Sequence, residues 1–411
     1  MGALKDLSQA LLDGRETTVD HHPFTPLFRA ERVAEGVTFV SSFANVTAID
    51  TADGLVLVDT GSFLLAPATR AILRELTTQL AHTAIYTHGH VDHCFGVDGY
   101  EAEAERKVRV VAHAKVPARF DRYKLTRRYN SCINTRQFQT NTEFPADFRY
   151  PDATFDKELA LEVGDRTFVL RHALGETDDH TFVWLPDAKV LCTGDLFIWA
   201  TPNCGNPQKV QRYPREWAMA LRAMASLGAE VLCPGHGVPI FGADAVRLAL
   251  EETAQLLESI VDQTLRLMNE GASLDRVLHE VRAPARLLGR PYLKPVYDEP
   301  EFIVRNIWRL YGGWWDGDPA ELKPAPRDAL AKEIAALAGG ATALAKRARA
   351  LVEVGDLRMA SHLAELAFQA APRDLDVRAA RRDVYAARAK DEKSLMARGI
   401  FASARDESEA V

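Results

Sequence analysis

The sequence has few cysteines, no long apolar run and no excess of positive charge. Its 411 residues include five cysteines, an odd number, and none of them forms a CxxC pair. Scattered cysteines of this kind argue against a disulfide framework and fit a reducing compartment. No apolar run approaches the roughly 20 residues that a membrane-spanning helix needs, and residues 1–20 lack the apolar core of a signal peptide. We therefore expect a cytoplasmic protein without a membrane span.

The charge balance also excludes one class of partner. Acidic residues number 57 and basic residues 50, for a net charge of −7, and the two signs are interspersed along the chain. A nucleic-acid-binding protein would carry a basic patch or stripe, which this sequence lacks. The length allows two or three domains at about 100–200 residues each. We expect a globular protein that acts on a small molecule.

One segment, THGHVDH at residues 87–93, concentrates three histidines and an aspartate after the apolar run 83–86. Neutral imidazole and carboxylate are ligands that Zn²⁺ accepts. His88 and His90 are two residues apart, so an extended backbone points both side chains the same way. Asp92 and His93 are adjacent and should diverge, which suits a second metal beside the first. The segment therefore predicts a metal site.

Three further ligand-type residues lie at the ends of predicted strands. They are His180, Asp195 and His236, and with the four in the histidine segment they make five histidines and two aspartates. A catalytic zinc needs only three protein ligands, so seven indicate two metals that share a carboxylate. We predict Asp92 and Asp195 as catalytic carboxylates. Histidine and aspartate also suit Fe and Mn.

Periodicity divides the chain into an α/β part and a helical part. Short β-rich runs recur around the histidine segment, and the stretch 121–150 has no clear period and is interpreted as a long loop. A helix is predicted over 244–270, and residues 343–369 and 374–390 are typical of antiparallel helix pairs of the tetratricopeptide kind. Such pairs need a neighbour to cover their apolar face, so they form either a helical cap or a dimerisation module. The predicted strands are 37–40, 45–49, 55–58, 83–87, 108–112, 158–163, 167–172, 180–185, 189–193 and 231–233.

Five motifs in order resemble the metallo-β-lactamase superfamily. They are DTG at 59–61, THGHVDH at 87–93, GETDDHT at 175–181, TGD at 193–195 and PGHG at 234–237. The resemblance implies an αββα sandwich with two zinc ions at one edge of its sheets. It also implies roles for eight residues: His88, His90 and His180 on the first metal, Asp92, His93 and His236 on the second, Asp195 between them, and Asp59 orienting the histidine segment.

The rest of the chain resembles the dimerisation domain of alkylsulfatases, through DQTLRL at 262–267 and YGGWWDGDPAEL at 311–322. This resemblance implies a catalytic domain over 1–245, a helical domain over 246–411, a homodimer through the C-terminal helices, and hydrolysis of an alkyl sulfate ester. Typical members carry glutamate where we place His180 and Asp195, and a His/Asp pair resembles glyoxalase II and lactonases. A lactone, thioester or phosphodiester is therefore the alternative substrate. A helical scaffold with a vestigial metal site is the alternative from another class.

Substrate recognition is predicted in two stretches of the sequence. The first is the cationic stretch 121–150, interpreted either as an anion-recognition loop over the metals or as a solvated loop. The second is 203–212, where the alkylsulfatase resemblance implies a sulfate-binding arginine some dozen residues after Asp195, a role for which Lys209 or Arg212 could substitute. Arginine suits sulfate because its guanidinium can donate two parallel hydrogen bonds. The candidates are Arg128, Tyr129, Asn130 and Arg136 in the first stretch, and Asn203, Lys209 and Arg212 in the second.

Overall fold

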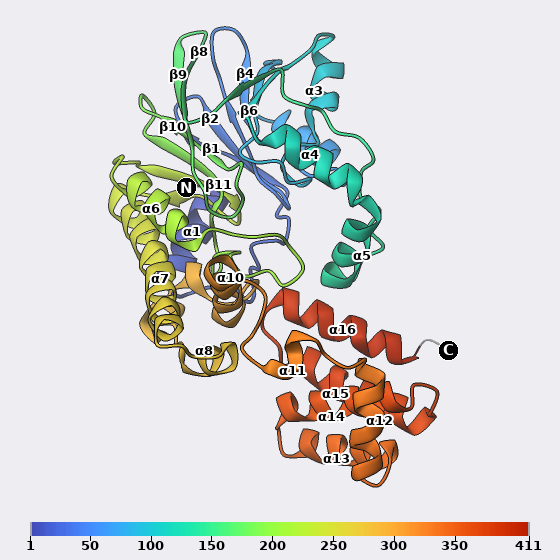
Figure 1. The fold of residues 1–411 in the computed structure, drawn as a ribbon. Helices are drawn as coiled ribbons and strands as arrows, with labels where there is room; N and C mark the ends of the chain where they lie inside the picture. Colours follow the sequence, from blue (N-terminus) through green and yellow to red (C-terminus); the bar gives the residue numbers. More distant parts are fainter. Residues whose placement is uncertain (1, 410–411) are drawn as a thin grey trace. The chain divides into compact units, whose positions relative to one another are not determined.

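The computed structural model describes residues 2–409 and divides the described chain into two compact units. The first unit contains the chain up to Arg127 together with Pro145–Gly313, and the second contains Arg128–Phe144 together with the chain from Trp314 onward (Figure 1). The polypeptide therefore passes between the units at three points, and a short internal segment of it belongs with the C-terminal helices.

The first unit contains a seven-stranded sheet whose spatial order follows the sequence. Neighbouring strands from β1 to β4 are antiparallel, and those from β4 to β7 are parallel. The antiparallel part is made by tight turns, such as the one in which Thr51 Oγ1 donates to Gly54 O at 2.6 Å. The strands are β1 (Arg29–Ala34), β2 (Val37–Ser41), β3 (Val46–Ile49), β4 (Leu55–Val58), β5 (Ala81–Ile85), β6 (Arg109–His113) and β7 (Ala153–Phe155).

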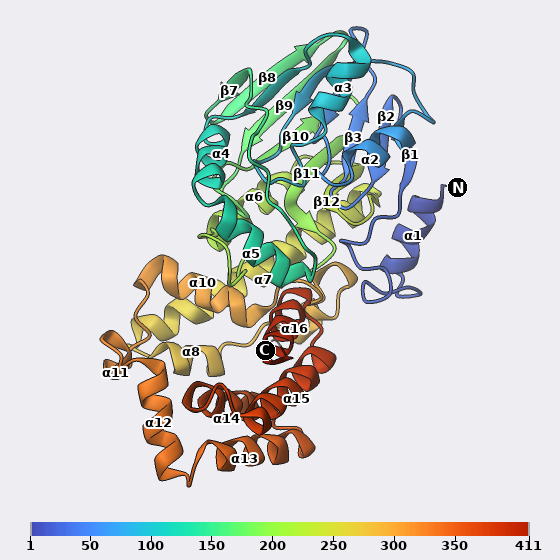
Figure 2. The ribbon, with the colours of Figure 1, turned by 90° about the vertical axis from the view of Figure 1, so that its right-hand side faces the viewer.

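A six-stranded sheet, with the order β13-β12-β11-β10-β9-β8, faces the first one (Figure 2). Only β11 and β12 are parallel among its described pairs, and they carry Asp195 and His236 respectively. Because β11 and β12 are parallel neighbours, two predicted metal ligands lie on adjacent strands of the sheet. The strands are β8 (Glu158–Val163), β9 (Arg166–His172), β10 (Thr181–Leu185), β11 (Val190–Ile198), β12 (Val231–His236) and β13 (Ile240–Phe241).

Helices cover the outer face of each sheet, while one core lies between the sheets. On the first sheet α2 (Ala66–Leu73) packs against β1 and β2, and α3 (Val97–Ala104) against β5; on the second, α6 (Pro214–Ala225) packs against β11, and α7 (Ala243–Asn269) against β12 and β13. The core joins buried side chains of both sheets, such as Phe39 and Phe168. The arrangement confirms the predicted αββα sandwich.

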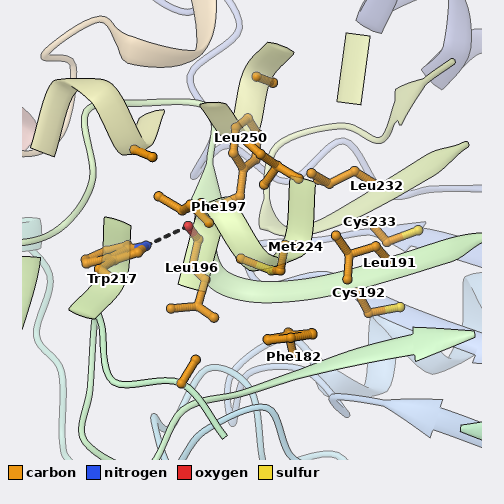
Figure 3. Close-up of a cluster of buried hydrophobic side chains, with 14 of the residues drawn as sticks. Phe182, Leu191, Cys192, Leu196, Phe197, Trp217, Met224, Leu232, Cys233 and Leu250 are labelled. Atoms are coloured by element: carbon orange, nitrogen blue, oxygen red, sulfur yellow. Dashed lines mark hydrogen bonds between the residues drawn. The ribbon is translucent and has the colours of Figure 1, made fainter. Parts of the chain in front are cut away.

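A cluster of buried hydrophobic side chains and one side-chain-to-backbone hydrogen bond hold the second sheet against its helices. Trp217 of α6 is fully buried, and its Nε1 donates to the backbone oxygen of Leu196 in β11 at 2.8 Å (Figure 3). Cys192 and Cys233 face each other across β11 and β12 in the same cluster, and all five cysteines of the chain are free thiols. The cluster fixes β11, and with it the position of Asp195.

The first unit extends beyond the boundary predicted at residue 245. The helix α10 (Pro300–Gly312) packs against α7 through the buried side chains Ile303, Val304 and Ile307, so its apolar stripe is part of the main core. The elements between them are α8 (Leu274–Glu280), α9 (Ala285–Leu288) and the 3₁₀ helix η1 (Pro291–Leu293). Compactness therefore divides the chain near Gly313, because helices after residue 245 complete the first core.

The second unit is entirely helical over its described residues. The helices α13 to α16 pack against one another in sequence order. The predicted range 343–369 contains a pair of helices, α13 and α14, whereas the range 374–390 is the single helix α15. Alanines dominate their contact surfaces, for example Ala348, Ala360 and Ala364, which lets the helices approach closely. Asp374 caps α15 by accepting from the backbone N–H groups of Asp376 and Val377. The helices are α5 (Arg127–Phe138), α11 (Pro319–Leu322), α12 (Arg327–Leu337), α13 (Ala341–Glu353), α14 (Leu357–Ala370), α15 (Leu375–Asp391) and α16 (Leu395–Glu409).

The interpretation of 121–150 as a long loop was wrong. The stretch contains the end of α4 (Val116–Leu125) and the whole of α5. The buried residues of α5 are Asn130, Ile133 and Gln137, which are spaced three and four apart as on one helical face. Two of them are polar, so the helix has no apolar period that a sequence pattern could show.

Candidate metal centre

The loops that follow β5 and β9, the interior of β11 and the end of β12 bring ligand-type side chains together in the first unit. Among the described residues, two groups have ligand atoms within 4.8 Å of one another. The first group is His88, His90, Glu176 and Asp195, and the second is Asp92, His93 and His236. The two predicted sets of ligands are therefore placed side by side, with one difference in membership.

In the first group, two imidazole nitrogens and one carboxylate oxygen converge. His88 Nε2 lies 2.8 Å from His90 Nδ1 and 3.7 Å from Glu176 Oε2. His90 Nδ1 lies 3.4 Å from the same Glu176 oxygen. Asp195 Oδ2 completes the group at 3.9 Å from His88 Nε2. His90 thus presents Nδ1, whereas His88 presents Nε2.

In the second group, the other oxygen of Asp195 takes part. Asp195 Oδ1 lies 3.3 Å from His93 Nε2 and 3.4 Å from His236 Nε2. Asp92 Oδ2 lies 3.5 Å from His236 Nε2 and 3.7 Å from His93 Nε2. Because its two oxygens face different groups, Asp195 is the residue that joins them.

The donor atoms themselves indicate a cation. His93 Nε2, His236 Nε2, Asp195 Oδ1 and Glu176 Oε2 are buried and have no hydrogen-bond partner within residues 2–409. Buried polar atoms normally have a partner, and electron-pair donors that converge on each other need a positive charge between them. Imidazole and carboxylate suit zinc, iron and manganese. The residues present therefore fit metal ions at this position.

The outer nitrogens of three ligand rings are held by hydrogen-bonding groups, as is usual for metal-binding histidines. His93 Nδ1 lies 2.7 Å from Asp59 Oδ2, and His88 Nδ1 lies 3.0 Å from Thr87 Oγ1. His236 Nδ1 contacts the backbone oxygen of Phe43. Asp59 also accepts from Thr87 N at 2.8 Å, and its φ of 59° is in the left-handed region that few non-glycine residues adopt. Its contacts place Asp59 directly behind the histidine segment.

Charges within the cluster shift the pKa values in opposite directions. Burial raises the pKa of Asp195, but His236 and His93 outweigh that effect and hold the pKa well below its usual range. Burial lowers the pKa of His236, but Asp195 and Asp92 outweigh it and raise the pKa to about 9. Burial lowers the pKa of His88 and of His90 well below the usual value, so both rings are neutral, which is the form that binds metal.

The structure places Glu176, not His180, in the first group. His180 is buried, and its Nε2 accepts from the backbone N–H of Asp195 at 3.1 Å. Its ring stacks on that of His88, with 4.5 Å between centroids, so it supports a ligand from outside. Glu176 was not predicted as a ligand, because a histidine was expected in that role within the segment 175–181. The glutamate that typical alkylsulfatases carry was the signal that could have found it.

A buried arginine, Arg119, positions the histidine segment, and no sequence motif indicated this role. Asp179 Oδ2 accepts from the backbone N–H of Gly89 at 3.0 Å and from Arg119 Nε at 2.7 Å. Arg119 also pairs with Asp178. Gly89 separates His88 from His90, so this network fixes the turn that carries both rings. Arg119 comes from α4, which we had predicted to lie partly in a loop.

The predicted substrate residues are divided between the two units. Arg128, Tyr129, Asn130 and Arg136 belong to the second unit. The others lie in the first unit between β11 and α6. There Asn203 Nδ2 donates to Glu176 Oε1 at 2.7 Å, and Arg212 pairs with the same carboxylate. Lys209 is half-buried, and burial together with the charge of Arg212 lowers its pKa to about 8.

The stretch that contains Asn203 is fixed by a buried carboxyl group whose protonation is expected to affect stability. Asp298 accepts from the backbone N–H groups of Gly205 at 2.5 Å and Glu299 at 2.7 Å. Burial raises its pKa from 3.8 to about 7. Between these values the folded protein keeps a proton that the unfolded chain has released. The contribution of Asp298 to stability is therefore lost as the pH rises through this window.

Asp298→Asn resembles the protonated carboxyl and is expected to remove this pH dependence. The wild type should lose free energy of unfolding relative to the variant by up to about 1.4 kcal/mol per pH unit between roughly pH 4 and 7. Urea unfolding of both proteins at several pH values measures the difference, in which other titrating groups cancel. Parallel stability curves would show that Asp298 is ionised throughout.

Two family models match the chain. Residues 41–236 match the model of the metallo-beta-lactamase superfamily, and residues 273–410 match the alkyl sulfatase dimerisation model. The chain belongs to the metallo-beta-lactamase superfamily. The predicted resemblance is confirmed for both parts, and this superfamily member carries its metal-binding residue groups on the matched sandwich.

Several curated relatives of this metallo-beta-lactamase superfamily protein are sulfatases that act on alkyl or aryl esters by name. It is 28% identical to a linear primary-alkylsulfatase of Pseudomonas sp., over 82% of this chain and 70% of that protein. It is 29% identical to an (R)-specific secondary-alkylsulfatase of Pseudomonas sp., over 83% of this chain and 56% of that protein. It is 27% identical to an alkyl/aryl-sulfatase of Saccharomyces cerevisiae, over 79% of this chain and 55% of that protein. The chain thus spans little more than half of two of these relatives.

Solved structures show the same fold. A stereoselective inverting sec-alkylsulfatase from Pseudomonas sp. superimposes with a TM-score of 0.85 and 24% sequence identity, over 93% of this chain and 66% of that chain. A double mutant of the same kind of enzyme gives a TM-score of 0.86 at 24% identity. The match extends through both compact units, so the sandwich followed by helices is an architecture found in solved superfamily structures.

Proposed function

We propose that the protein is a hydrolase of alkyl sulfate esters that depends on two zinc ions. The observation that carries the proposal is the pair of ligand groups joined by Asp195, whose two oxygens face one group each. The names of the curated relatives support the choice of an alkyl sulfate as the substrate. The finding of Glu176 in the first group supports it further, because the argument for a lactone rested on His180 as the ligand.

The proposed ligands differ from the predicted set at one position. His88, His90 and Glu176 would hold the first metal, and Asp92, His93 and His236 the second, with Asp195 shared. When bound, two metal ions supply a water of lowered pKa and positive charge that stabilises the anionic group of a substrate. His180 would support His88 and Asp195 through stacking and a backbone hydrogen bond.

The residues around the ligands hold the site in one arrangement and supply charge. Asp59 and Thr87 orient the rings of His93 and His88, so these nitrogens keep their direction. Lys209 is the proposed contact for a sulfate oxygen, since the charges of Asp92 and Glu176 act on it and it is half-buried. An ammonium group contacts an anion as a point charge, so Lys209 would confer less directional specificity than an arginine.

A hydrolysis screen tests the proposed function. Purified protein with zinc is expected to hydrolyse octyl sulfate faster than a matched lactone, thioester or phosphodiester. His90→Ala removes a ligand and is expected to reduce the rate at least about 100-fold, since metal-bound water supplies several kcal/mol of the catalysis. His279→Ala, at an exposed helix position, is the control and should keep wild-type activity. Faster hydrolysis of another ester would show that the proposed substrate is wrong. Wild-type protein that binds zinc but hydrolyses none of these esters would contradict the proposal that the protein is an enzyme.

The dimer and the cellular location are also proposals. The match of 273–410 to an alkyl sulfatase dimerisation model supports a homodimer through the C-terminal helices. Light scattering at micromolar concentration should therefore give twice the mass of 45.5 kDa, and a monomeric mass would contradict this. The five free cysteines support a reducing compartment such as the cytoplasm. Among the described residues, no helix combines the length and hydrophobicity that crossing a membrane requires.

A further inference from the structure

The two oxygens of the Glu176 carboxylate have different partners. Oε1 accepts from Asn203 Nδ2 at 2.7 Å and pairs with the guanidinium of Arg212, which also contacts the backbone oxygen of Glu176. Oε2 faces His88 and His90 and has no hydrogen-bond partner in the described part of the chain. One oxygen is therefore committed to the protein, and the other points to the first ligand group.

Arg212 is itself held on both sides of its backbone by one residue. Its N–H donates to Asn306 Oδ1 at 3.3 Å, and Asn306 Nδ2 donates to its carbonyl oxygen at 3.1 Å. Gln211 Nε2 adds a bond of 2.7 Å to Asn306 Oδ1. Asn306 is in α10, which belongs to the region matched by the dimerisation model. A polar chain therefore runs from α10 through Arg212 to Glu176, all within the first unit.

The three residues of this series of polar contacts are almost completely buried. Arg212 is 2% exposed, Asn306 5% and Glu176 0%. A buried charge must be paired, so the carboxylate and the guanidinium neutralise each other, and neither can move away without leaving the other unpaired. Arg212 Nη1 is therefore committed to Glu176, although this arginine was predicted to bind the anionic group of a substrate.

We propose that Arg212 and Asn203 are positioning residues for Glu176, and that Asn306 fixes Arg212 in turn. By holding Oε1 they direct Oε2 toward His88 and His90, where it would be the oxygen that holds the first metal. The inference rests on the proposed function, because it concerns the metal site of that same hydrolase. It assigns to Asn203 and Arg212 a role in metal binding in place of substrate binding.

The test is zinc affinity without substrate, measured by competition with a chromophoric chelator. Removing a residue that orients a metal ligand typically lowers metal affinity 10–100-fold. Arg212→Gln and Asn203→Ala are expected to weaken one zinc per chain by about this factor and to leave the other within about threefold. Asn306→Ala should act in the same direction with a smaller effect, and Arg212→Lys should restore part of the affinity by donating one hydrogen bond.

A second measurement separates positioning from substrate binding. At saturating zinc, the KM for octyl sulfate and the inhibition by inorganic sulfate should be unchanged in Asn203→Ala and Arg212→Gln. If KM rises and sulfate inhibition weakens while zinc affinity is retained, the two residues bind substrate and the inference is overturned. Asn203→Ala carries the test if Arg212→Gln fails to fold, because it removes one neutral hydrogen bond without unpairing a charge.

Controls separate this inference from stability and from the function itself. Arg222→Gln removes an arginine from an exposed ion pair with Glu258 and should change neither zinc affinity nor melting temperature appreciably. Variants that melt earlier but keep wild-type zinc affinity would show a purely structural role and overturn the inference. If the wild type binds two zinc ions without hydrolysing alkyl sulfate, the proposed substrate fails while the positioning role stands.

Discussion

Asp195→Asn is expected to abolish hydrolysis and to weaken the binding of both metal ions at once. Asp195 Oδ2 faces His88 of the first group, and Oδ1 faces His93 and His236 of the second. An amide replaces one of these oxygens with an N–H₂ group, which donates and cannot be a ligand to a cation. Because metal-bound water supplies several kcal/mol, the rate should fall roughly 10³-fold or more.

Metal analysis after dialysis, together with the initial rate on octyl sulfate, measures this effect. Asp187→Asn makes the same chemical change at a half-exposed turn position of the same unit and should leave both quantities at the wild-type level. Loss of a single zinc with the other fully retained would mean that Asp195 belongs to one metal only. Full activity in Asp195→Asn would exclude the shared-carboxylate arrangement.

Gly399→Ala is expected to destabilise the second unit, although alanine is ordinarily the better helix former by about 1 kcal/mol. Gly399 lies within α16, where a β-carbon would stand 1.9 Å from the backbone oxygen of Gln137 in α5. A backbone atom cannot rotate away, so the two helices must separate. Overpacking of this kind typically costs about 1–3 kcal/mol. Thermal unfolding followed by circular dichroism should show a lower melting temperature for the helical unit.

Gly99→Ala is the matched control for this substitution. Gly99 is also helical, but its added β-carbon would meet only the guanidinium of Arg70, at the far end of a flexible side chain. The same change there should be close to neutral. A variant Gly399→Ala as stable as the wild type would show that α5 and α16 do not approach each other this closely.

The correct predictions concern segments in which the residues that carry out a role also form a recognisable local sequence pattern. The segment 87–93 could be recognised because histidines two residues apart after an apolar strand have few structural uses other than metal binding. The C-terminal helix pairs could be recognised because alanine and leucine recur on one face. In both cases the residue types needed for the structure are also the ones that make the pattern visible.

The features that the sequence analysis missed depend on contacts between distant residues. Glu176 becomes a ligand only because Arg212 and Asn203 turn its Oε2 toward the histidines. The helix α5 buries Asn130 and Gln137, and polar residues on a buried face give no apolar period. The role of Asn306 depends on α10 folding back onto a loop about a hundred residues earlier in the chain. No local pattern encodes such pairings.

The exchange of the segment Arg128–Phe144 into the second unit has a consequence for protein engineering. A gene fragment that begins at Trp314 encodes the C-terminal helices without α5, so the surface around Gly399 would meet water in place of a helix. The residues from 314 onward therefore do not form a complete unit by themselves. A chimera in which the helical unit is exchanged must also take residues 128–144 from the same parent protein. Likewise, cleavage after residue 313 leaves α5 on the N-terminal fragment, although α5 belongs to the second unit.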